Sequence, residues 1–123
     1  MLITKKEYKS VGECLYSGEL ENGLKIFVLP KQGYNSRYAV FGTHYGGAMR
    51  RFAIDGETID TPAGVAHFLE HKMFDMPDGS NALTTLSENG ADANAFTSSD
   101  LTCYHFSCTE HFEERRDRCF PTL

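Results

Sequence analysis

Alternation of apolar and polar residues predicts short β-strands over much of the chain. Two such runs flank Asn22 and Gly23, and Asn-Gly between apolar runs is a strong signal for a β-hairpin. The strands are expected at residues 15–20, 24–29, 37–45, 91–97 and 101–108. Residues 1–13 and 48–60 are polar and weakly patterned, so we expect an irregular lead-in and a polar connection there.

A helical period replaces this alternation between residues 61 and 74, where one α-helix is expected. Thr61 is a suitable N-cap for it. Pro62 suits the first helical position, because the N–H that proline lacks would have no partner there. Placed at 100° per residue, the apolar side chains fall on one broad arc: Val65, Ala66, Phe68, Leu69 and Met73.

The opposite side of this helix carries the candidate chemistry. His67, Glu70 and His71 gather there, together with Phe74. Residues four apart lie one above the other on a helix, so two imidazoles can bind a single metal ion. A carboxylate beside them could then act on water bound to that metal.

A second, shorter helix is expected from Asn81 to about Asn89, with Ser80 as its N-cap and Gly90 at its end. The predicted order is three strands, two helices and two strands. This order indicates an α+β fold, in which helices cover a mainly antiparallel sheet. The length of 123 residues predicts a single domain, 1–123.

Composition narrows the class of partner and the compartment. The chain is 41% hydrophobic and 12% aromatic, as is usual for a globular protein. Its formal net charge of −5 gives no sign of nucleic acid or an acidic membrane as partner. No apolar run reaches the roughly eighteen residues that a transmembrane helix needs. The first residues lack the apolar core of a signal peptide, so we expect a cytoplasmic protein.

The cysteines do not form a recognised metal or redox motif. They are Cys14, Cys103, Cys108 and Cys119, and none are spaced as C-x-x-C. Cys103 and Cys108 are five positions apart, so they would point to opposite faces of one strand. We expect four reduced thiols, as in a cytoplasmic chain.

His67, Glu70 and His71 form the arrangement H-x-x-E-H, the reverse of the zinc-binding H-E-x-x-H helix. In a zinc site each histidine would supply a neutral imidazole nitrogen, and Glu70 would take a proton from the bound water. Catalytic zinc usually has three protein ligands, so two histidines form an incomplete set. The alternative is a solvated helix face. The other histidines are expected to be structural or solvated: His44, His105 and His111.

Two segments of the chain form a wider pattern. The first runs from Gly64 to Phe74 and reads GVAHFLEHKMF; the second, GADANAFTS, runs from Gly90 to Ser98, with Thr102-Cys103-Tyr104 after it. Together they resemble the pitrilysin/insulinase (M16) family of zinc peptidases. The HKMF ending and the ANAFTS run are most similar to bacterial processing-peptidase-like members. The resemblance extends from about residue 15 to 112. It implies one truncated half of an M16 (LuxS/processing-peptidase-like) domain.

The resemblance also implies a site and a substrate. Zn²⁺ would be bound by His67 and His71, and Glu70 would be the general base. Asn94 and Ala95 match the pair that contacts the substrate backbone, which fits a peptide adding to the sheet as an extra strand. The implied partners are a peptide or unfolded protein and another M16-type subunit in a homo- or hetero-oligomer. Neither nucleic acid nor a membrane is implied.

The family's third zinc ligand is a glutamate on a later helix, about seventy residues beyond the motif. Fewer residues than that follow His71, so we expect this ligand, and the second similarly folded domain of the family, to be missing. Glu110, Glu113 and Glu114 lie too early to match it.

The last residues show no usable periodicity. Residues 109–114 begin like a helix, but Arg115 and Arg116 stand where apolar residues would continue it. We expect an irregular tail over 115–123, as in a prematurely ended or out-of-frame version of a longer protein. Besides a truncated zinc peptidase, the alternatives are an inactive peptide-binding or partner module and a non-functional truncation product.

Overall fold

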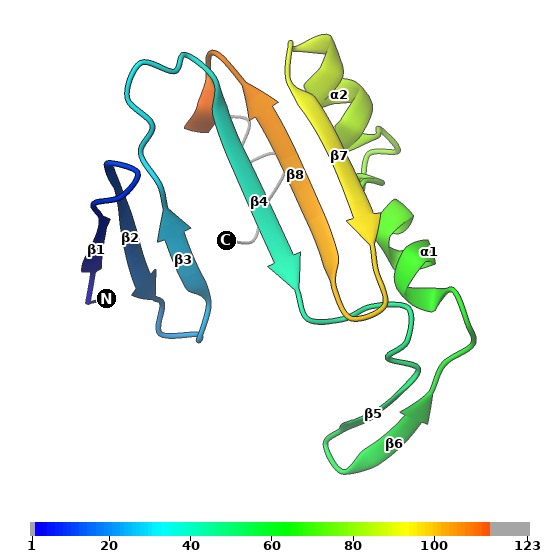
Figure 1. The fold of residues 1–123 in the computed structure, drawn as a ribbon. Coiled ribbons are helices and arrows are strands. Elements are labelled where there is room, and N and C mark those ends of the chain that lie inside the picture. The colour runs from blue at the N-terminus through cyan, green and yellow to red at the C-terminus, as the bar shows by residue number, and fades with distance from the viewer. Residues whose placement is uncertain (1, 114–123) are drawn as a thin grey trace. The chain divides into compact units, whose positions relative to one another are not determined.

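The computed structural model describes residues 2–113, and the chain divides into two compact units. The first unit is Met1–Asn35 and the second is Ser36–Leu123. Figure 1 shows the strands and helices of both. Cys119 and the predicted tail, 115–123, lie outside the described residues.

The first unit is a three-stranded antiparallel sheet in the order β1-β2-β3. Its strands are β1 (Thr4–Tyr8), β2 (Glu13–Glu19) and β3 (Lys25–Val28). Gly23, at φ 84°, lies in the turn between β2 and β3, so the predicted hairpin is confirmed. The irregular lead-in was wrong, because β1 pairs with β2. All five β1 residues are exposed, so the strand has no buried face to produce an alternating pattern.

The second unit contains a sheet in the order β4-β8-β7. Its strands are β4 (Arg37–Thr43), β7 (Asp92–Thr97) and β8 (Thr102–Cys108), all antiparallel to their neighbours. β4 ends two residues earlier than expected. The helices α1 (Val65–Lys72) and α2 (Ala82–Glu88) pack on one side of β7 (Figure 1). The expected α+β fold, helices on a mainly antiparallel sheet, is confirmed.

The core of this unit lies between α2 and the sheet. Leu86 of α2 and Phe106 of β8 are 1% and 0% exposed. Ala91 and Cys108 complete the buried cluster, and Phe112 stacks on Phe106 with ring centroids 5.3 Å apart. Burial of these side chains is the main force that holds α2 on the sheet.

A second hairpin replaces the polar connection that the sequence predicted at 48–60. It consists of β5 (Arg51–Ile54) and β6 (Glu57–Asp60), and it projects away from the sheet (Figure 1). Asp55 and Gly56 form the turn with φ angles of 51° and 84°. Two successive positive φ values match the twist of a tight hairpin and favour Asp-Gly.

Both predicted helix starts were wrong. α1 begins after Gly64, whose φ of 91° is left-handed, and not after Thr61. The Thr61 hydroxyl instead donates to the carbonyl of Arg50, 3.1 Å away. α2 is capped by Asn81, whose Oδ1 accepts from the first-turn N–H groups. Ser80 does not cap it; its hydroxyl donates to Asp78.

The exposed side of α1 is its apolar side. Phe68 and Met73 are 60% and 67% exposed, and Leu69 is also exposed. The residues that α1 buries against the sheet are instead Ala66 and Glu70. No described helix has the length and apolar character needed to cross a membrane.

Candidate metal centre

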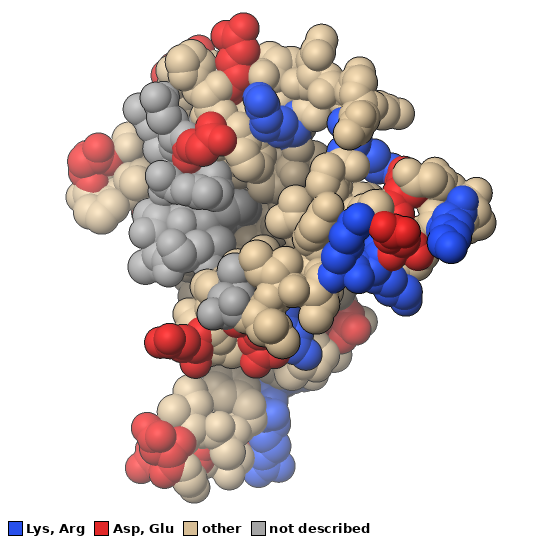
Figure 2. All heavy atoms as spheres, turned by 90° about the vertical axis from the view of Figure 1, so that its left-hand side faces the viewer, with Lys and Arg blue, Asp and Glu red and all other residues tan. Residues whose placement is uncertain are grey.

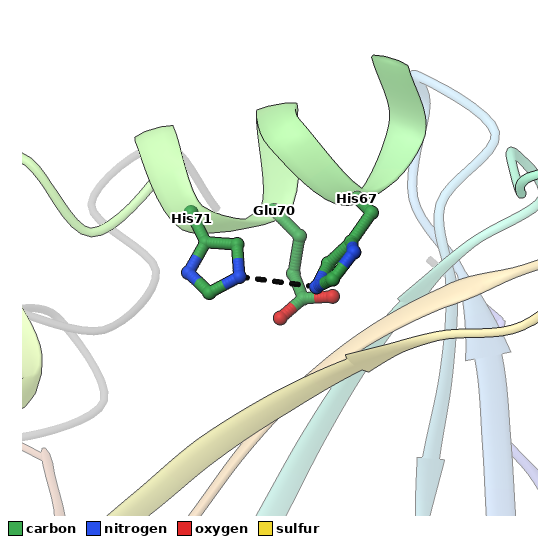
Figure 3. A group of neighbouring side chains, drawn as sticks. All are labelled: His67, Glu70 and His71. Carbon is green, nitrogen blue, oxygen red and sulfur yellow. Dashed lines mark hydrogen bonds between the residues drawn. The ribbon is translucent and has the colours of Figure 1, made fainter. Parts of the chain in front are cut away.

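The polar side of α1 faces the strands below it. His67, Glu70 and His71 leave the helix on the same side and point toward the sheet (Figure 3). Their spacing of three and four residues places them within one helical turn. α1 contacts both β7 and β8, so the sheet forms the floor of this site.

The two histidines converge on one point. Their Nε2 atoms are 3.0 Å apart, and the ring centroids are 4.8 Å apart. Two nitrogen ligands of a tetrahedral zinc ion are separated by about 3.3 Å, given Zn–N bonds of about 2.0–2.1 Å. Both rings are exposed, and the ligand atoms of the trio lie within 4.8 Å of one another. These donors therefore fit one zinc ion.

Glu70 differs from the histidines in its burial. It is 7% exposed, and its Oε2 accepts a hydrogen bond from the Thr97 hydroxyl over 2.5 Å. Thr97 is the last residue of β7. The carboxylate is thus tied to the end of a strand, beneath the helix that carries it.

The pKa of Tyr104, a residue of β8, is also affected by this carboxylate. Burial, and then the negative charge of Glu70, raise the pKa of the Tyr104 phenol above its usual value. The ring meets Phe74 edge to face, with centroids 5.7 Å apart. The region around Glu70 is therefore partly desolvated and aromatic.

Two loops are hydrogen-bonded to each other beside Thr97. The N–H groups of Gly47 and Ala48 donate to the carbonyls of Ser98 and Ser99 at 2.8 and 2.9 Å. A side chain at Gly46 would place its Cβ 2.5 Å from the nitrogen of Asp100, so only glycine permits this approach. The loop after β4 therefore holds the turn between β7 and β8.

Asn94 and Ala95 lie on β7, which pairs with β8 alone among the described strands. The Ser98 N–H donates to the Leu101 carbonyl, and hydrogen-bonded and non-hydrogen-bonded pairs alternate in an antiparallel ladder. By this alternation Ala95, opposite Tyr104, belongs to a non-hydrogen-bonded pair. Its N–H therefore points to the outer edge, where it donates to Asn94 Oδ1 at 2.8 Å.

The structure brings together the trio that the sequence singled out as the metal site. Within residues 2–113 no further group of three His, Cys, Asp or Glu residues has this proximity. Two further positions support the site and were given no role from sequence: Gly46 and Thr97. Thr97 stands inside the ANAFTS run, and that run is the one signal that could have drawn attention to it.

Charged side chains are mixed on the face shown in Figure 2, where acidic and basic groups lie among other residues. The described residues on that face form no broad basic patch, the usual footprint of nucleic-acid binding. The sheet, the helix with two convergent imidazoles and the carboxylate beside them together form a candidate metal centre.

Comparison with known proteins identifies the family. The sequence pattern of "Insulinase (Peptidase family M16)" matches residues 56–114. Zinc protease YmfH of Bacillus subtilis (strain 168) is 46% identical over 114 residues, which cover 91% of this chain and 26% of that protein. Human insulin-degrading enzyme is 31% identical over 121 residues, or 93% of this chain and 10% of that protein.

A solved structure agrees with these sequences. An M16-like peptidase from Alicyclobacillus acidocaldarius has a TM-score of 0.82 and 34% identity over 89% of this chain. The chain belongs to the M16 (insulinase-like) peptidase family. It spans about a quarter of the length of these two bacterial relatives, 26% in each case.

Proposed function

We propose that this chain carries the metal-binding helix and the general base of a zinc metalloendopeptidase that hydrolyses peptide bonds in extended peptides. The observation that carries the proposal is the convergence of His67 and His71, with Nε2 atoms 3.0 Å apart, beside the buried carboxylate of Glu70. Membership of the M16 family and the names of the relatives, which include zinc proteases, support it.

Each member of the trio has one role. His67 and His71 would bind the metal through Nε2, the atoms that face each other. Glu70 accepts a proton from the attacking water and later delivers it to the leaving amine. Zinc, when bound, supplies Lewis acidity that polarises the scissile carbonyl and acidifies water.

The outer edge of β7 holds the substrate. An extended peptide can add there as a strand, with main-chain hydrogen bonds giving affinity. Asn94 Oδ1 accepts from the Ala95 N–H, the place that a peptide carbonyl takes in an added strand. We infer that the Asn94 amide swings aside as the peptide pairs with Ala95, and that it then bonds the peptide backbone.

Two histidines leave the metal shell incomplete, since catalytic zinc usually has three protein ligands. We propose that the remaining ligand and the enclosing second domain come from another part of a longer protein or from another M16-type subunit. A cytoplasmic location stays a prediction.

Metal content and peptide cleavage test this function together. The full chain should bind zinc, and His67→Ala with His71→Ala should abolish that binding. His44→Ala is the matched control, because His44 is also an exposed histidine and lies outside the trio. Glu70→Gln should keep zinc and lose cleavage, because the amide cannot accept the proton.

The free edge of β7 favours a second candidate, a peptide-binding module without catalysis. Peptide binding with no cleavage in the wild-type chain, and no effect of Glu70→Gln, would favour that module. Zinc binding that survives loss of both histidines would contradict the metal site itself.

A further inference from the structure

We propose that Thr97 is a positioning residue for Glu70: its hydroxyl holds the carboxylate of the general base in the one orientation that serves the metal site. The proposal rests on the proposed function. It starts from the hydrogen bond of 2.5 Å between Thr97 Oγ1 and Glu70 Oε2, which joins β7 to α1.

The described residues offer Glu70 a single hydrogen-bond donor. Thr97 is the one donor to its carboxylate, although the residue is 7% exposed. A buried carboxylate without a donor is costly, so this contact decides where the side chain lies. Thr97 binds Oε2, which leaves Oε1 to take a proton.

The hydroxyl of Thr97 donates its hydrogen to the carboxylate of Glu70. A threonine hydroxyl carries a single donor hydrogen. The neighbouring Thr102 hydroxyl, 3.4 Å from that of Thr97, gives its own hydrogen to the carbonyl of Tyr45 at 2.8 Å. An ionised carboxylate only accepts, so Thr97 is the donor to Glu70 at 2.5 Å, and the Thr102 oxygen at 3.4 Å is the poorer acceptor for its hydrogen.

The backbone on both sides of Thr97 is fixed by hydrogen bonds. Thr97 lies opposite Thr102 at the end of the β7–β8 ladder, and the next residue, Ser98, donates its N–H to the Leu101 carbonyl. The turn that follows is bonded to Gly47 and Ala48 of the loop after β4. A donor fixed in this way can orient a long, flexible glutamate, which otherwise samples several rotamers.

β7 thereby serves two purposes on its two sides. Asn94 is exposed on one face, and Thr97, three residues on, faces α1 on the other. The strand that we propose binds the peptide therefore also positions the side chain of Glu70. β7 would thus fix the substrate and the general base relative to each other. A base displaced by about 1 Å can lose about 100-fold in rate.

Substitutions at Thr97 separate positioning from stability. Thr97→Val keeps the shape and removes the hydroxyl, whereas Thr97→Ser keeps the hydroxyl. Thr85→Val is the matched control, because Thr85 is also part-buried and donates to a carbonyl, that of Asn81, within α2. Each variant is made in the full chain and compared by unfolding, zinc content and side-chain NMR couplings of Glu70.

The couplings report the rotamers of Glu70 without any need for activity. We expect a single rotamer in the wild type, in Thr97→Ser and in Thr85→Val, and averaging over several in Thr97→Val. Zinc content should be unchanged throughout. Where the wild type cleaves peptide, Thr97→Val should lower kcat about 10- to 100-fold with KM unchanged, and Thr97→Ser should restore it.

A single Glu70 rotamer in Thr97→Val would overturn the proposal, and so would a failure of serine to rescue. Unchanged kcat in Thr97→Val, alongside cleavage that depends on Glu70, would overturn it as well. Failure of the proposed function looks different: the wild type would bind no zinc or cleave nothing, while the couplings would still decide whether Thr97 orients Glu70.

Discussion

At the scale of single residues, Ala95 has a backbone N–H that the sheet does not use. It points to the outer edge of β7 and, among residues 2–113, donates to the side chain of its neighbour, Asn94. Proline is tolerated on strand edges where its missing N–H faces outward. This residue can therefore be changed to test the edge without breaking the ladder to β8.

Ala95→Pro should weaken the binding of an extended peptide to the zinc-free chain about tenfold or more. One hydrogen bond, worth about 0.5–1.5 kcal/mol, is lost, and the ring obstructs the approaching strand. Fluorescence anisotropy of a labelled peptide measures the effect. Val40→Pro is the control, because by the β4–β8 register its N–H points to the opposite edge of the sheet. Equal losses in both variants would argue against docking on β7.

Tyr104 gives a pH dependence whose sign follows from its environment. Its pKa is raised in the folded chain, so folding favours the neutral phenol. The stability that this provides is present below the ordinary tyrosine value of 10.0 and is lost as pH rises through the folded pKa. Chemical denaturation of the wild type below and above pH 10.0 should show a lower free energy of unfolding at the higher pH.

Tyr104→Phe should not show this loss, because it has no proton to release. Glu70→Gln should move the tyrosinate transition of Tyr104 back toward its ordinary value, since the carboxylate charge is one of the two causes of the shift. A transition that is identical in wild type and Glu70→Gln would mean that the two groups do not interact.

The sequence was sufficient to predict the trio, but it did not predict the residues that position the trio. Spacing alone places His67, Glu70 and His71 on one side of a helix, because helical geometry is local. The partner of Glu70, Thr97, is 27 positions away, and no local rule relates the two. The role of Gly46 depends on a loop that folds against it from beyond β7, which the residue type does not reveal.

At the scale of elements, the loop after β4 and the turn after β7 are joined by backbone hydrogen bonds and by a close approach at Gly46. Gly46→Ala should destabilise the chain by about 1–3 kcal/mol, because its Cβ would lie 2.5 Å from the nitrogen of Asp100. Gly47→Ala is the control, since its Cβ would be 3.6 Å from the Ser98 carbonyl oxygen. Chemical denaturation compares the two; similar losses would show that the close approach does not matter.

The elements also show where periodicity misleads. The order of most strands and both helices followed from apolar patterns, but β5 and β6 did not, since most of their residues are exposed. Asp55-Gly56 was a hairpin signal within that polar stretch. The apolar arc of α1 suggests that this side is buried. Glu70 is buried against the sheet instead, where its carboxylate accepts a hydrogen bond from Thr97.

At the scale of the whole molecule, the apolar side of α1 is exposed. Phe68 and Leu69 of the helix and Met73 at its C-cap are all exposed, and clustered apolar exposure is typical of interaction surfaces. It suits the proposed contact with another domain or subunit of M16 type. The metal ligands leave the same helix toward the sheet (Figure 3).

Phe68→Gln with Leu69→Gln should therefore reduce self-association in light scattering and leave zinc content unchanged. The free energy of unfolding at low concentration should change by no more than about 0.5 kcal/mol, as for ordinary surface substitutions. His105→Ala, outside this surface, should scatter like the wild type. Unfolding that is weakened by several kcal/mol would contradict the exposure of this side.

The central strand of the metal-site sheet, β8, follows the two other described strands of that sheet in the chain. A ribosome therefore releases β4, both helices and β7 before the strand that joins them exists. Until β8 inserts, β4 and β7 have no common neighbour, and unpaired strands invite pairing with other chains. In the cell, the order of synthesis makes the arrival of one strand the step at which sheet, helix and general base come together.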